Sequence, residues 1–267
     1  MTARLALITG ATGGIGRAVA SRLMRDSYAI VVHYATNEAA AGDLVGTLRE
    51  AGGTAWAIQA DLATEAGVDS SARAIRALLD EDLDRRLSVV VNNASSMLSP
   101  SFGATSTSDF DLYFSLNVRA PFMLTQQLAE LMVEGGSIIN ISSAAAHFSS
   151  PNDITYAMSK AALESMTVHA APALARRGVR INTVIPGFTD NGHPAFDDLN
   201  VLAHMSSFAV MSGVASPSVV ADAVSFLVSE QASRTTGSSL DVSGGSTIGA
   251  RPSGTGTFSL RQWLTSR

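Results

Sequence analysis

The sequence contains no cysteine, which excludes disulfide bonds and metal sites built from thiolates. Histidine is scarce too, and the five histidines show neither i, i+4 pairing nor the close spacing of metal ligands. We therefore interpret the histidines as surface or packing residues and expect no bound metal. They are His33, His147, His169, His193 and His204.

Long apolar runs and an excess of positive charge are also missing. No stretch approaches the roughly 18 consecutive apolar residues of a membrane span, and residues 1–4 lead straight into a strand-like segment without the pattern of a signal peptide. The formal net charge is -5, whereas nucleic-acid-binding proteins concentrate Lys and Arg. These absences predict a cytoplasmic protein that acts on a small molecule, without a membrane or nucleic-acid partner.

What the sequence does have is an alternation of short apolar segments with longer helical patterns over most of its 267 residues. The short segments are rich in Val and Ile and apolar at successive positions, as in parallel strands covered on both faces. We therefore predict an α/β fold, a doubly wound parallel sheet with helices on both faces, in a single domain. The expected strands are 5–9, 29–33, 55–59, 89–92, 137–141 and 180–185, and the expected helices are 15–25, 38–51, 65–79, 109–132, 156–177 and 218–229.

Glycines and a change in composition predict where elements and the domain end. Glycines at 52–53, 135–136 and 178 follow helical patterns, where a left-handed residue closes a helix. After residue 245 the chain becomes rich in Gly, Ser, Thr and Pro, so we assign one domain to residues 1–245 and a C-terminal tail to 246–267. The tail is either disordered or docked on the body or a neighbouring subunit through its apolar residues. These are Phe258, Leu260, Trp263 and Leu264.

A glycine-rich turn follows the first expected strand, in Thr9-Gly-Ala-Thr-Gly-Gly-Ile-Gly16. Glycines between a strand and a helix let backbone N–H groups approach a pyrophosphate, and the N-terminus of the helix favours its negative charge. The spacing of Gly10, Gly14 and Gly16 differs from the common dinucleotide fingerprint Gly-x-Gly-x-x-Gly. The turn alone therefore leaves an ordinary tight turn as the alternative.

Three residues further along the chain indicate hydride chemistry on a carbonyl group. Tyr156 and Lys160 are four residues apart, so they share one helix face, and Ser143 lies thirteen residues before Tyr156. A phenol that titrates at about pH 10 is a poor acid at neutral pH, and a nearby ammonium makes its proton available by stabilising the phenolate. Ser143 follows an expected strand, where its hydroxyl faces the ligand crevice and can orient a carbonyl. Ser142 is the neighbouring alternative.

Together these motifs resemble the short-chain dehydrogenase/reductase family. Asn92-Asn-Ala94 and Pro186-Gly187 complete the order and spacing of that family, over residues 4 to about 245. The resemblance implies a Rossmann-like fold and an oxidoreductase whose catalytic residues are Asn117, Ser143, Tyr156 and Lys160. The cofactor-binding residues that it implies are Gly10, Thr12, Gly14, Ile15, Gly16, Tyr34, Thr36, Asn37, Asp61, Leu62, Asn92, Ala94, Tyr156, Lys160, Pro186, Gly187 and Thr189.

Two of these residues have a competing structural interpretation. Asn117 stands in the middle of a helical pattern, where an amide is ordinarily solvent-facing. In relatives a helix distortion at this Asn frees a carbonyl to hold a water, which completes a proton relay to the lysine. Asp61 resembles the adenine contact of the family, and a helix-capping aspartate is its alternative.

The end of the second expected strand decides which nicotinamide cofactor fits. An acidic side chain there accepts hydrogen bonds from the adenosine ribose and repels a 2′-phosphate. Positions 33–37 hold no carboxylate, and Thr36, Asn37 and Arg17 are available as donors, so we favour NADP(H) over NAD(H). Gly13 occupies a position that is often basic in relatives that use NADP.

Residues 188–216 correspond to the segment that closes over the substrate in relatives. The segment contains no Lys or Arg, so an anionic substrate has no partner within it. Its apolar residues either line an adaptable lid or anchor the segment to the core. They are Phe188, Phe196, Leu199, Met205, Phe208 and Met211.

The layout is similar to 3-oxoacyl-carrier-protein and polyketide ketoreductases, and Asn92-Asn-Ala-Ser-Ser96 is similar to pteridine reductases. We therefore expect an enzyme, an NADP(H)-dependent reductase that converts a ketone to a secondary alcohol with Tyr156 as general acid. The alternatives are an NAD-dependent alcohol dehydrogenase, a pteridine-type reductase and a non-catalytic dinucleotide-binding sensor.

Relatives also imply a homotetramer or a dimer. Its subunits would meet through the helices expected at 109–132 and 156–177. Small residues on the second of these helices would permit close packing. They are Ala157, Ala161, Ala162 and Ala171.

Overall fold

The computed structural model describes residues 3–192, 194–211 and 213–248, in which seven strands form one sheet in the order β3-β2-β1-β4-β5-β6-β7. Every neighbouring pair is parallel. The predicted doubly wound α/β fold is confirmed. The strands are β1 (Ala3–Ile8), β2 (Ala29–Tyr34), β3 (Ala55–Gln59), β4 (Arg85–Asn92), β5 (Met132–Ile141), β6 (Arg180–Pro186) and β7 (Ser239–Val242).

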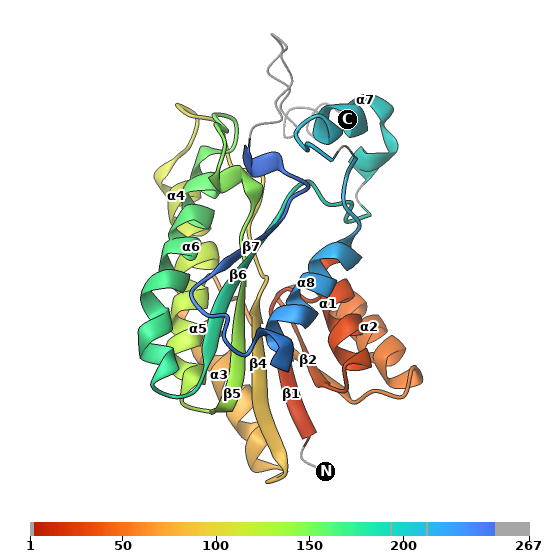
Figure 1. Ribbon diagram of the computed structural model, residues 1–267, viewed down its shortest axis with the longest axis vertical. Helices are drawn as coiled ribbons and strands as arrows, with labels where there is room; N and C mark the ends of the chain where they lie inside the picture. The colour runs from red at the N-terminus through yellow and green to blue at the C-terminus, as the bar shows by residue number, and fades with distance from the viewer. Residues whose placement is uncertain (1–2, 193, 212, 249–267) are drawn as a thin grey trace.

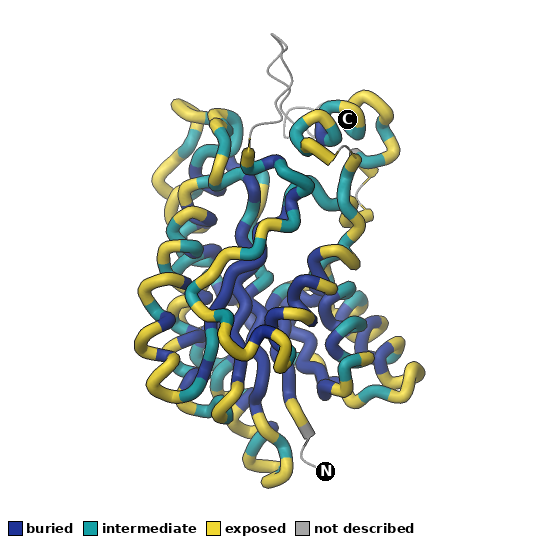
Figure 2. Tube along the Cα trace, in the orientation of Figure 1, coloured by how far each residue is buried: buried dark blue, intermediate teal, exposed yellow. Residues whose placement is uncertain are grey.

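Helices cover both faces of the sheet (Figure 1). One face packs against α1, α2 and α8, and the other packs against α3, α5 and α6. The centre of the sheet is accordingly buried along its length (Figure 2). The helices are α1 (Gly14–Arg25), α2 (Glu38–Glu50), α3 (Glu65–Asp80), α4 (Thr107–Phe114), α5 (Ala120–Ala129), α6 (Ile154–Ala175), α7 (Leu199–Ser206) and α8 (Pro217–Val228).

The strand order changes direction between β1 and β4. From β1 the chain moves outward through β2 to β3, then returns to the other side of β1 and continues through β4 to β7. In an open parallel sheet this switch point leaves a crevice at the carboxyl ends of the strands, where ligands bind. The glycine turn after β1 and the asparagines that end β4 therefore meet there.

The single helix expected at 109–132 was a wrong prediction. The segment forms α4, a π-helical turn (Ser115–Arg119) and then α5, which ends at Ala129. Met132 already belongs to β5, and Gly135 lies inside that strand with a φ of +85° instead of ending a helix. The apolar residues run continuously from helix to strand, so their pattern did not mark the boundary. The four-residue edge strand β7 was also missed.

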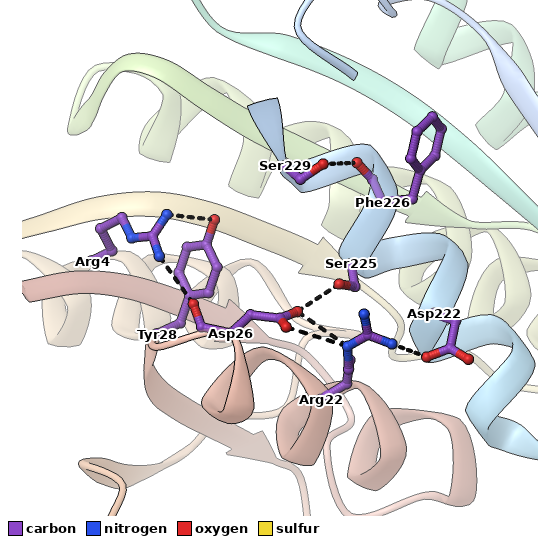
Figure 3. A network of polar contacts seen from close by, with 8 residues as sticks. All are labelled: Arg4, Arg22, Asp26, Tyr28, Asp222, Ser225, Phe226 and Ser229. Atoms are coloured by element: carbon purple, nitrogen blue, oxygen red, sulfur yellow. Dashed lines mark hydrogen bonds and ion pairs between the residues drawn. The ribbon is translucent and has the colours of Figure 1, made fainter. Parts of the chain in front are cut away.

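A polar network holds α8 against α1 (Figure 3). The Arg22 guanidinium lies 3.3 Å from the Asp26 carboxylate and also contacts Asp222 on α8. The Ser225 hydroxyl donates a hydrogen bond of 2.6 Å to the same Asp26. Partly exposed ion pairs contribute only about 0–1 kcal/mol, so the network mainly fixes orientation. Since α8 follows residues 187–216, the network fixes where that segment returns to the body.

The predicted division between body and tail falls close to the end of the described residues. Ser246 is buried and donates to the Ser243 carbonyl at 3.0 Å, so the chain is still attached to the body at this point. Residues Phe258, Leu260, Trp263 and Leu264 lie outside the described residues. Among the described helices, none has both the length and the apolar character needed to cross a membrane.

Candidate active site

The glycine turn is held in shape by a buried histidine. Gly10 has a φ of +60°, which a residue without a side chain adopts at no steric cost, and its N–H donates to His33 Nδ1 at 3.2 Å. Because Nδ1 accepts, the proton is on Nε2, which donates to the Ala60 carbonyl at 3.1 Å. Burial lowers the pKa of His33 to about 4, so the imidazole stays neutral. His33 is thus a packing residue, as predicted, and it also connects the turn to the end of β3.

A second residue that the sequence did not reveal, Asn93, ties the turn to β4. Its amide donates to the carbonyls of Thr9 and Gly10 at 2.9 and 3.0 Å. A Cβ atom on Gly16 would lie 2.5 Å from the Gly10 carbonyl oxygen and 2.9 Å from that amide, so no side chain fits there. The turn is therefore preorganised for a ligand that approaches its backbone. Proximity in sequence to Asn92 was the only available signal.

The neighbouring Asn92 points into a buried polar network instead. Asn92 Nδ2 donates to Asn140 Oδ1 at 2.8 Å, and Asn140 Nδ2 donates to Thr167 Oγ1 at 2.9 Å. The Thr167 and Thr183 hydroxyls are 2.7 Å apart. The network crosses β4, β5, α6 and β6, all of them buried at these positions. It fixes α6, the helix of Tyr156 and Lys160, relative to the sheet.

Residues 33–37, at the end of β2, provide polar hydrogen-bond donors and contain no carboxylate. Thr36 and Asn37 are exposed, and Asn37 caps α2 by accepting from Ala40 N at 3.0 Å. Arg17 spans the gap to the glycine turn, because it donates to the Thr12 carbonyl at 3.2 Å and to the Ala40 carbonyl at 2.9 Å. The guanidinium therefore lies between the turn and the first turn of α2, which follows β2. Tyr34 packs in the core.

The other predicted cofactor residues occupy varied environments. Asp61 is exposed, and the cap of α3 is Thr64, so the helix-capping alternative for Asp61 is wrong. Leu62 is buried in the core beneath α3 and offers a ligand only its backbone. The Thr189 hydroxyl donates to the Gly187 carbonyl at 3.1 Å. Ala94 lies against Gly10, Thr12 and Ile15 are half-buried in the turn, and Pro186 is buried at the end of β6.

The structure brings Ser143, Tyr156 and Lys160 together. Tyr156 and Lys160 project from the same face of α6, with the Lys160 ammonium 5.6 Å from the centre of the Tyr156 ring. Ser143 follows the end of β5, and its side chain lies close enough to the phenol to lower the pKa of Tyr156. Tyr156 is 9% and Lys160 2% exposed. Ser142, the alternative to Ser143, is instead engaged by Glu164.

Burial sets the charge of both residues on α6. It raises the pKa of Tyr156 well above the usual value for tyrosine, the hydrogen bond from Ser143 opposes the rise, and the charges of Asp153 and Tyr113 add to it. Burial lowers the pKa of Lys160 to about 7, against the attraction of Glu164. Lys160 Nζ donates to the Ile141 carbonyl at 2.8 Å. At neutral pH the phenol keeps its proton, so Tyr156 can donate one.

Asn117 lies in the middle of the π-helical turn and is 1% exposed. The interpretation as a solvent-facing residue is therefore wrong, and the helix is distorted where the resemblance implied. Asn117 Oδ1 accepts from Ser96 N at 2.8 Å, and Nδ2 donates to Ser159 Oγ at 2.9 Å. Since Ser159 precedes Lys160 on α6, this amide links the distorted turn to the helix that holds the ammonium. π-Turns within helices are frequent at functional sites.

A set of hydrogen bonds from Ser99 to Asp153, called the latch below, joins the segment after β4 to the start of α6. Asp153 Oδ1 accepts from Ser99 N and Oγ at 2.6 and 2.8 Å, and Ser99 Oγ in turn accepts from Tyr156 N at 3.2 Å. Ser99 is fully buried. The latch therefore positions the backbone of Tyr156 and places a carboxylate near its phenol. Sequence reasoning missed both partners because 54 residues separate them.

We expect the variant Asp153→Asn to lose reductive activity at a lower pH than the parent protein. The variant retains the shape of the latch but removes a charge that raises the pKa of Tyr156, so the phenol would lose its proton earlier as the pH rises. The measurement is the alkaline limb of kcat/KM against pH. Asp43→Asn, at an exposed position on α2, serves as the control. An alkaline limb that stays in place would limit Asp153 to a structural role.

The segment expected to close over the substrate has its own small core. Val201 and Met205 of α7 are buried against Phe188, Phe196 and Val214. This cluster is separate from the two cores on the faces of the sheet. Leu199 and Met211 are exposed instead. The six predicted apolar residues therefore divide between residues that stabilise the segment and residues that face outward.

Comparisons with known proteins agree with this arrangement. The model of a family described as enoyl-(acyl carrier protein) reductase matches residues 10–247. A (3R)-3-hydroxyacyl-CoA dehydrogenase from Canis lupus familiaris is 37% identical over 254 residues, covering 90% of this chain and 95% of the relative. A 3-oxoacyl-[acyl-carrier-protein] reductase from a Synechocystis species is 33% identical over 250 residues, covering 92% and 97%.

A solved structure gives the same result. The crystal structure of the angucycline C-6 ketoreductase LanV with bound NADP matches with a TM-score of 0.88 at 37% identity, covering 92% of this chain and 96% of LanV. The match to the family model covers the glycine turn, the end of β4, and the three residues Ser143, Tyr156 and Lys160, and the match to LanV covers 92% of the chain. The chain is an oxidoreductase that belongs to the short-chain dehydrogenase/reductase family.

Proposed function

We propose that this enzyme uses NADPH to reduce a ketone to a secondary alcohol, with Tyr156 as the proton donor. The observation that carries the proposal is a buried, protonated phenol beside Ser143 and Lys160 at the carboxyl edge of the sheet. LanV, which this chain resembles, was crystallised with NADP, and also with NADP and rabelomycin. The two candidate classes of ketone are the 3-oxoacyl and the polyketide type, on which relatives of this chain are named as acting.

The residues around the glycine turn fit a dinucleotide with a 2′-phosphate. Backbone N–H groups at the start of α1 would hold the pyrophosphate, because Gly10 and Gly16 leave no side chain in the way. Arg17, Thr36 and Asn37 would face the adenosine ribose and its phosphate. When bound, NADPH supplies the hydride that reduces the carbonyl carbon.

The protein itself handles the carbonyl oxygen and its proton. Ser143 donates a hydrogen bond to that oxygen, and Tyr156 transfers its proton there as negative charge develops. The ammonium of Lys160 then stabilises the phenolate that remains. We assign Asn117 the proton-relay role that the resemblance implies, since the π-turn opens the helix at that residue. The water-poor surroundings strengthen each of these interactions.

Two measurements test the proposal. Fluorescence titration with NADPH and NADH distinguishes it from an NAD-dependent alcohol dehydrogenase, and the expected result is tighter binding of NADPH. Loss of NADPH absorbance with a panel of ketones and an oxidised pteridine distinguishes a ketone reductase from a pteridine-type reductase and from a non-catalytic sensor. A protein that binds NADPH but consumes none with any member of the panel would contradict the proposal.

We expect the variant Ala35→Asp to lose its preference for NADPH. Ala35 is the first residue after β2 and is exposed, so an aspartate there would repel a 2′-phosphate and accept hydrogen bonds from a free ribose. The ratio of kcat/KM for NADPH to that for NADH should fall at least about tenfold, which corresponds to about 1.4 kcal/mol. Ala35→Asn, which has the same shape without the charge, should leave the ratio near that of the parent.

We further propose that the enzyme forms a dimer or a tetramer through the outer face of α4, α5 and α6. Phe122 of α5 and Met158 and Val168 of α6 are exposed, and a hollow at these helices is lined by Phe114, Phe122 and Met166 among others. The predicted alanine stripe on α6 needs one correction, because Ala171 is buried in the core and does not reach this face. Light scattering should give a multiple of the subunit mass, and a monomer would refute the assignment.

A further inference from the structure

The segments that frame the substrate side of the crevice carry no cation. They follow the strands from β4 to β7 and cover residues 93–106, 142–153, 187–216 and 243–248, and none contains Lys or Arg. They do contain four aspartates, so their formal charge is negative. The described histidines add little positive charge, because burial lowers the pKa of His204 and His147 is paired with the Glu164 carboxylate at 3.0 Å. The aspartates are Asp153, Asp190, Asp197 and Asp198.

The same segments present apolar and aromatic side chains. Phe208 follows α7 and contacts both Phe148 and Phe188, with ring centroids 5.3 and 5.4 Å apart. Phe148 lies five residues after Ser143, and Phe188 follows Pro186-Gly187, so this aromatic row is built from segments that leave the carboxyl ends of β5 and β6. Several other large apolar side chains of the same segments are exposed. They are Met97 at 53%, Phe102 at 81%, Leu199 at 78%, Val210 at 58%, Met211 at 81% and Ile248 at 80%.

We propose that the substrate is an uncharged, carrier-free ketone on a planar ring system, and not an acyl thioester of coenzyme A or of a carrier protein. This inference rests on the proposed ketone reduction and names its substrate class. A flat apolar ketone gains binding free energy because it covers the exposed apolar side chains and stacks against the half-buried rings of the row.

Charge weighs against the thioesters. The phosphates of coenzyme A, and the phosphate that joins a carrier protein to its acyl arm, are held elsewhere by Arg and Lys. Here the described cations near the carboxyl edge, Arg17 and Arg119, lie on the cofactor half, where they donate to the carbonyls of Thr12 and Ala63. Lys160 is buried. The arginines at 251, 261 and 267 lie outside the described residues. A phosphate at the substrate side would therefore lie beside segments that carry aspartates and supply no Lys or Arg of their own as a counter-charge.

Three ketones test the assignment with the full-length enzyme and NADPH. 1-Tetralone is a planar, uncharged ketone, and S-acetoacetyl-N-acetylcysteamine and acetoacetyl-CoA carry the same 3-oxoacyl thioester without and with phosphates. We expect kcat/KM to be at least about tenfold higher for 1-tetralone than for acetoacetyl-CoA, equivalent to about 1.4 kcal/mol. The neutral thioester should also exceed acetoacetyl-CoA, and added NaCl should narrow the gap between the two by screening the aspartates.

Variants separate the two parts of the argument. Phe208→Leu should lower kcat/KM for 1-tetralone about tenfold and change the neutral thioester by less than about threefold, because only the flat ring uses the stack. Phe226→Leu, at a partly exposed position on α8, is the matched control. Asp197→Lys should raise kcat/KM for acetoacetyl-CoA alone. Because Phe208→Leu could unfold its segment, Phe148→Leu tests the row from the segment that follows β5.

The outcomes distinguish failure of this inference from failure of the proposed function. If acetoacetyl-CoA is reduced as efficiently as 1-tetralone or better, the enzyme is still a ketone reductase but the substrate class is wrong. If Phe208→Leu and Phe148→Leu leave 1-tetralone unaffected, the aromatic row is not part of the site and the assignment also fails. If none of the three ketones consumes NADPH while 2′-phosphate-dependent binding persists, the proposed reduction itself is contradicted.

Discussion

The variant Tyr156→Phe is expected to lose reductive turnover by a factor of about 10²–10⁴, the usual contribution of a positioned general acid. Phenylalanine keeps the buried aromatic ring at this position of α6 but lacks the hydroxyl proton that the carbonyl oxygen must receive. The affinity for NADPH should stay within a few-fold of the parent value, since the glycine turn and Arg17 are unaffected. The measurements are kcat from the loss of NADPH absorbance and the dissociation constant from fluorescence titration.

A matched variant controls for loss of a buried phenol in general. Tyr28→Phe removes a hydroxyl that accepts from Arg4 (Figure 3), and Tyr28 directly precedes β2, at the amino end of that strand, whereas the site lies at the carboxyl ends. Its turnover should equal that of the parent. Substantial residual activity in Tyr156→Phe would remove the tyrosine from the role of acid and leave Ser143 as the group that contacts the carbonyl.

The second large effect is expected from Lys160→Met. Methionine fills a similar apolar volume but has no charge to stabilise the phenolate, so kcat should fall by about 10²–10³, as when a single stabilising donor is removed from a catalytic site. Lys160 is the only lysine in the sequence, so its side-chain signal in an NMR spectrum of lysine-labelled protein is unambiguous. Titration of that signal should give a pKa of about 7.

The same variant should be more stable than the parent protein at neutral pH. Lowering the pKa of Lys160 from 10.5 to about 7 by burial corresponds to roughly 4 to 5 kcal/mol. Removing the ammonium leaves the Ile141 carbonyl without its donor, which costs roughly 1–3 kcal/mol, so a net gain is expected. Urea unfolding of the cofactor-free proteins at one protein concentration measures the difference.

The pH dependence of that difference follows from linkage. Between about pH 7 and 10.5 the unfolded parent chain binds a proton at Lys160 that the folded chain does not, so the stability of the parent rises with pH over this window. Below about pH 7 both states are protonated and the penalty is constant. The advantage of Lys160→Met should therefore be largest at and below pH 7 and should shrink toward pH 10. An advantage that grows with pH would show that the ammonium is not buried in the folded protein.

Local pattern was sufficient for most of the fold. Runs of Val and Ile such as Ala29–Tyr34 favour burial in a sheet, and glycines directly after a strand indicate a turn because they tolerate a positive φ, so the strands up to β6 and the glycine turn were evident from the residues. The failures occurred where two kinds of element share one apolar pattern. Met132 looked helical because the apolar residues of α5 continue into β5, and only pairing with Leu87 on β4 makes it a strand.

The sequence by itself predicted which groups would do the chemistry, since the four-residue spacing of Tyr156 and Lys160 places them on one helix face and Lys160 is the only lysine in the chain. Its prediction of a cytoplasmic location stays a prediction. Only the tertiary structure decided how these groups are tuned. Three features tune them, and each depends on residues far apart in the chain. They are the burial of the Tyr156 and Lys160 side chains, the latch from Ser99 to Asp153, and the anchoring of the turn by His33 and Asn93. Desolvation and hydrogen bonding depend on the distances between groups in space. The sequence does not give these distances, because they are set only when the parallel sheet brings the carboxyl ends of its strands together.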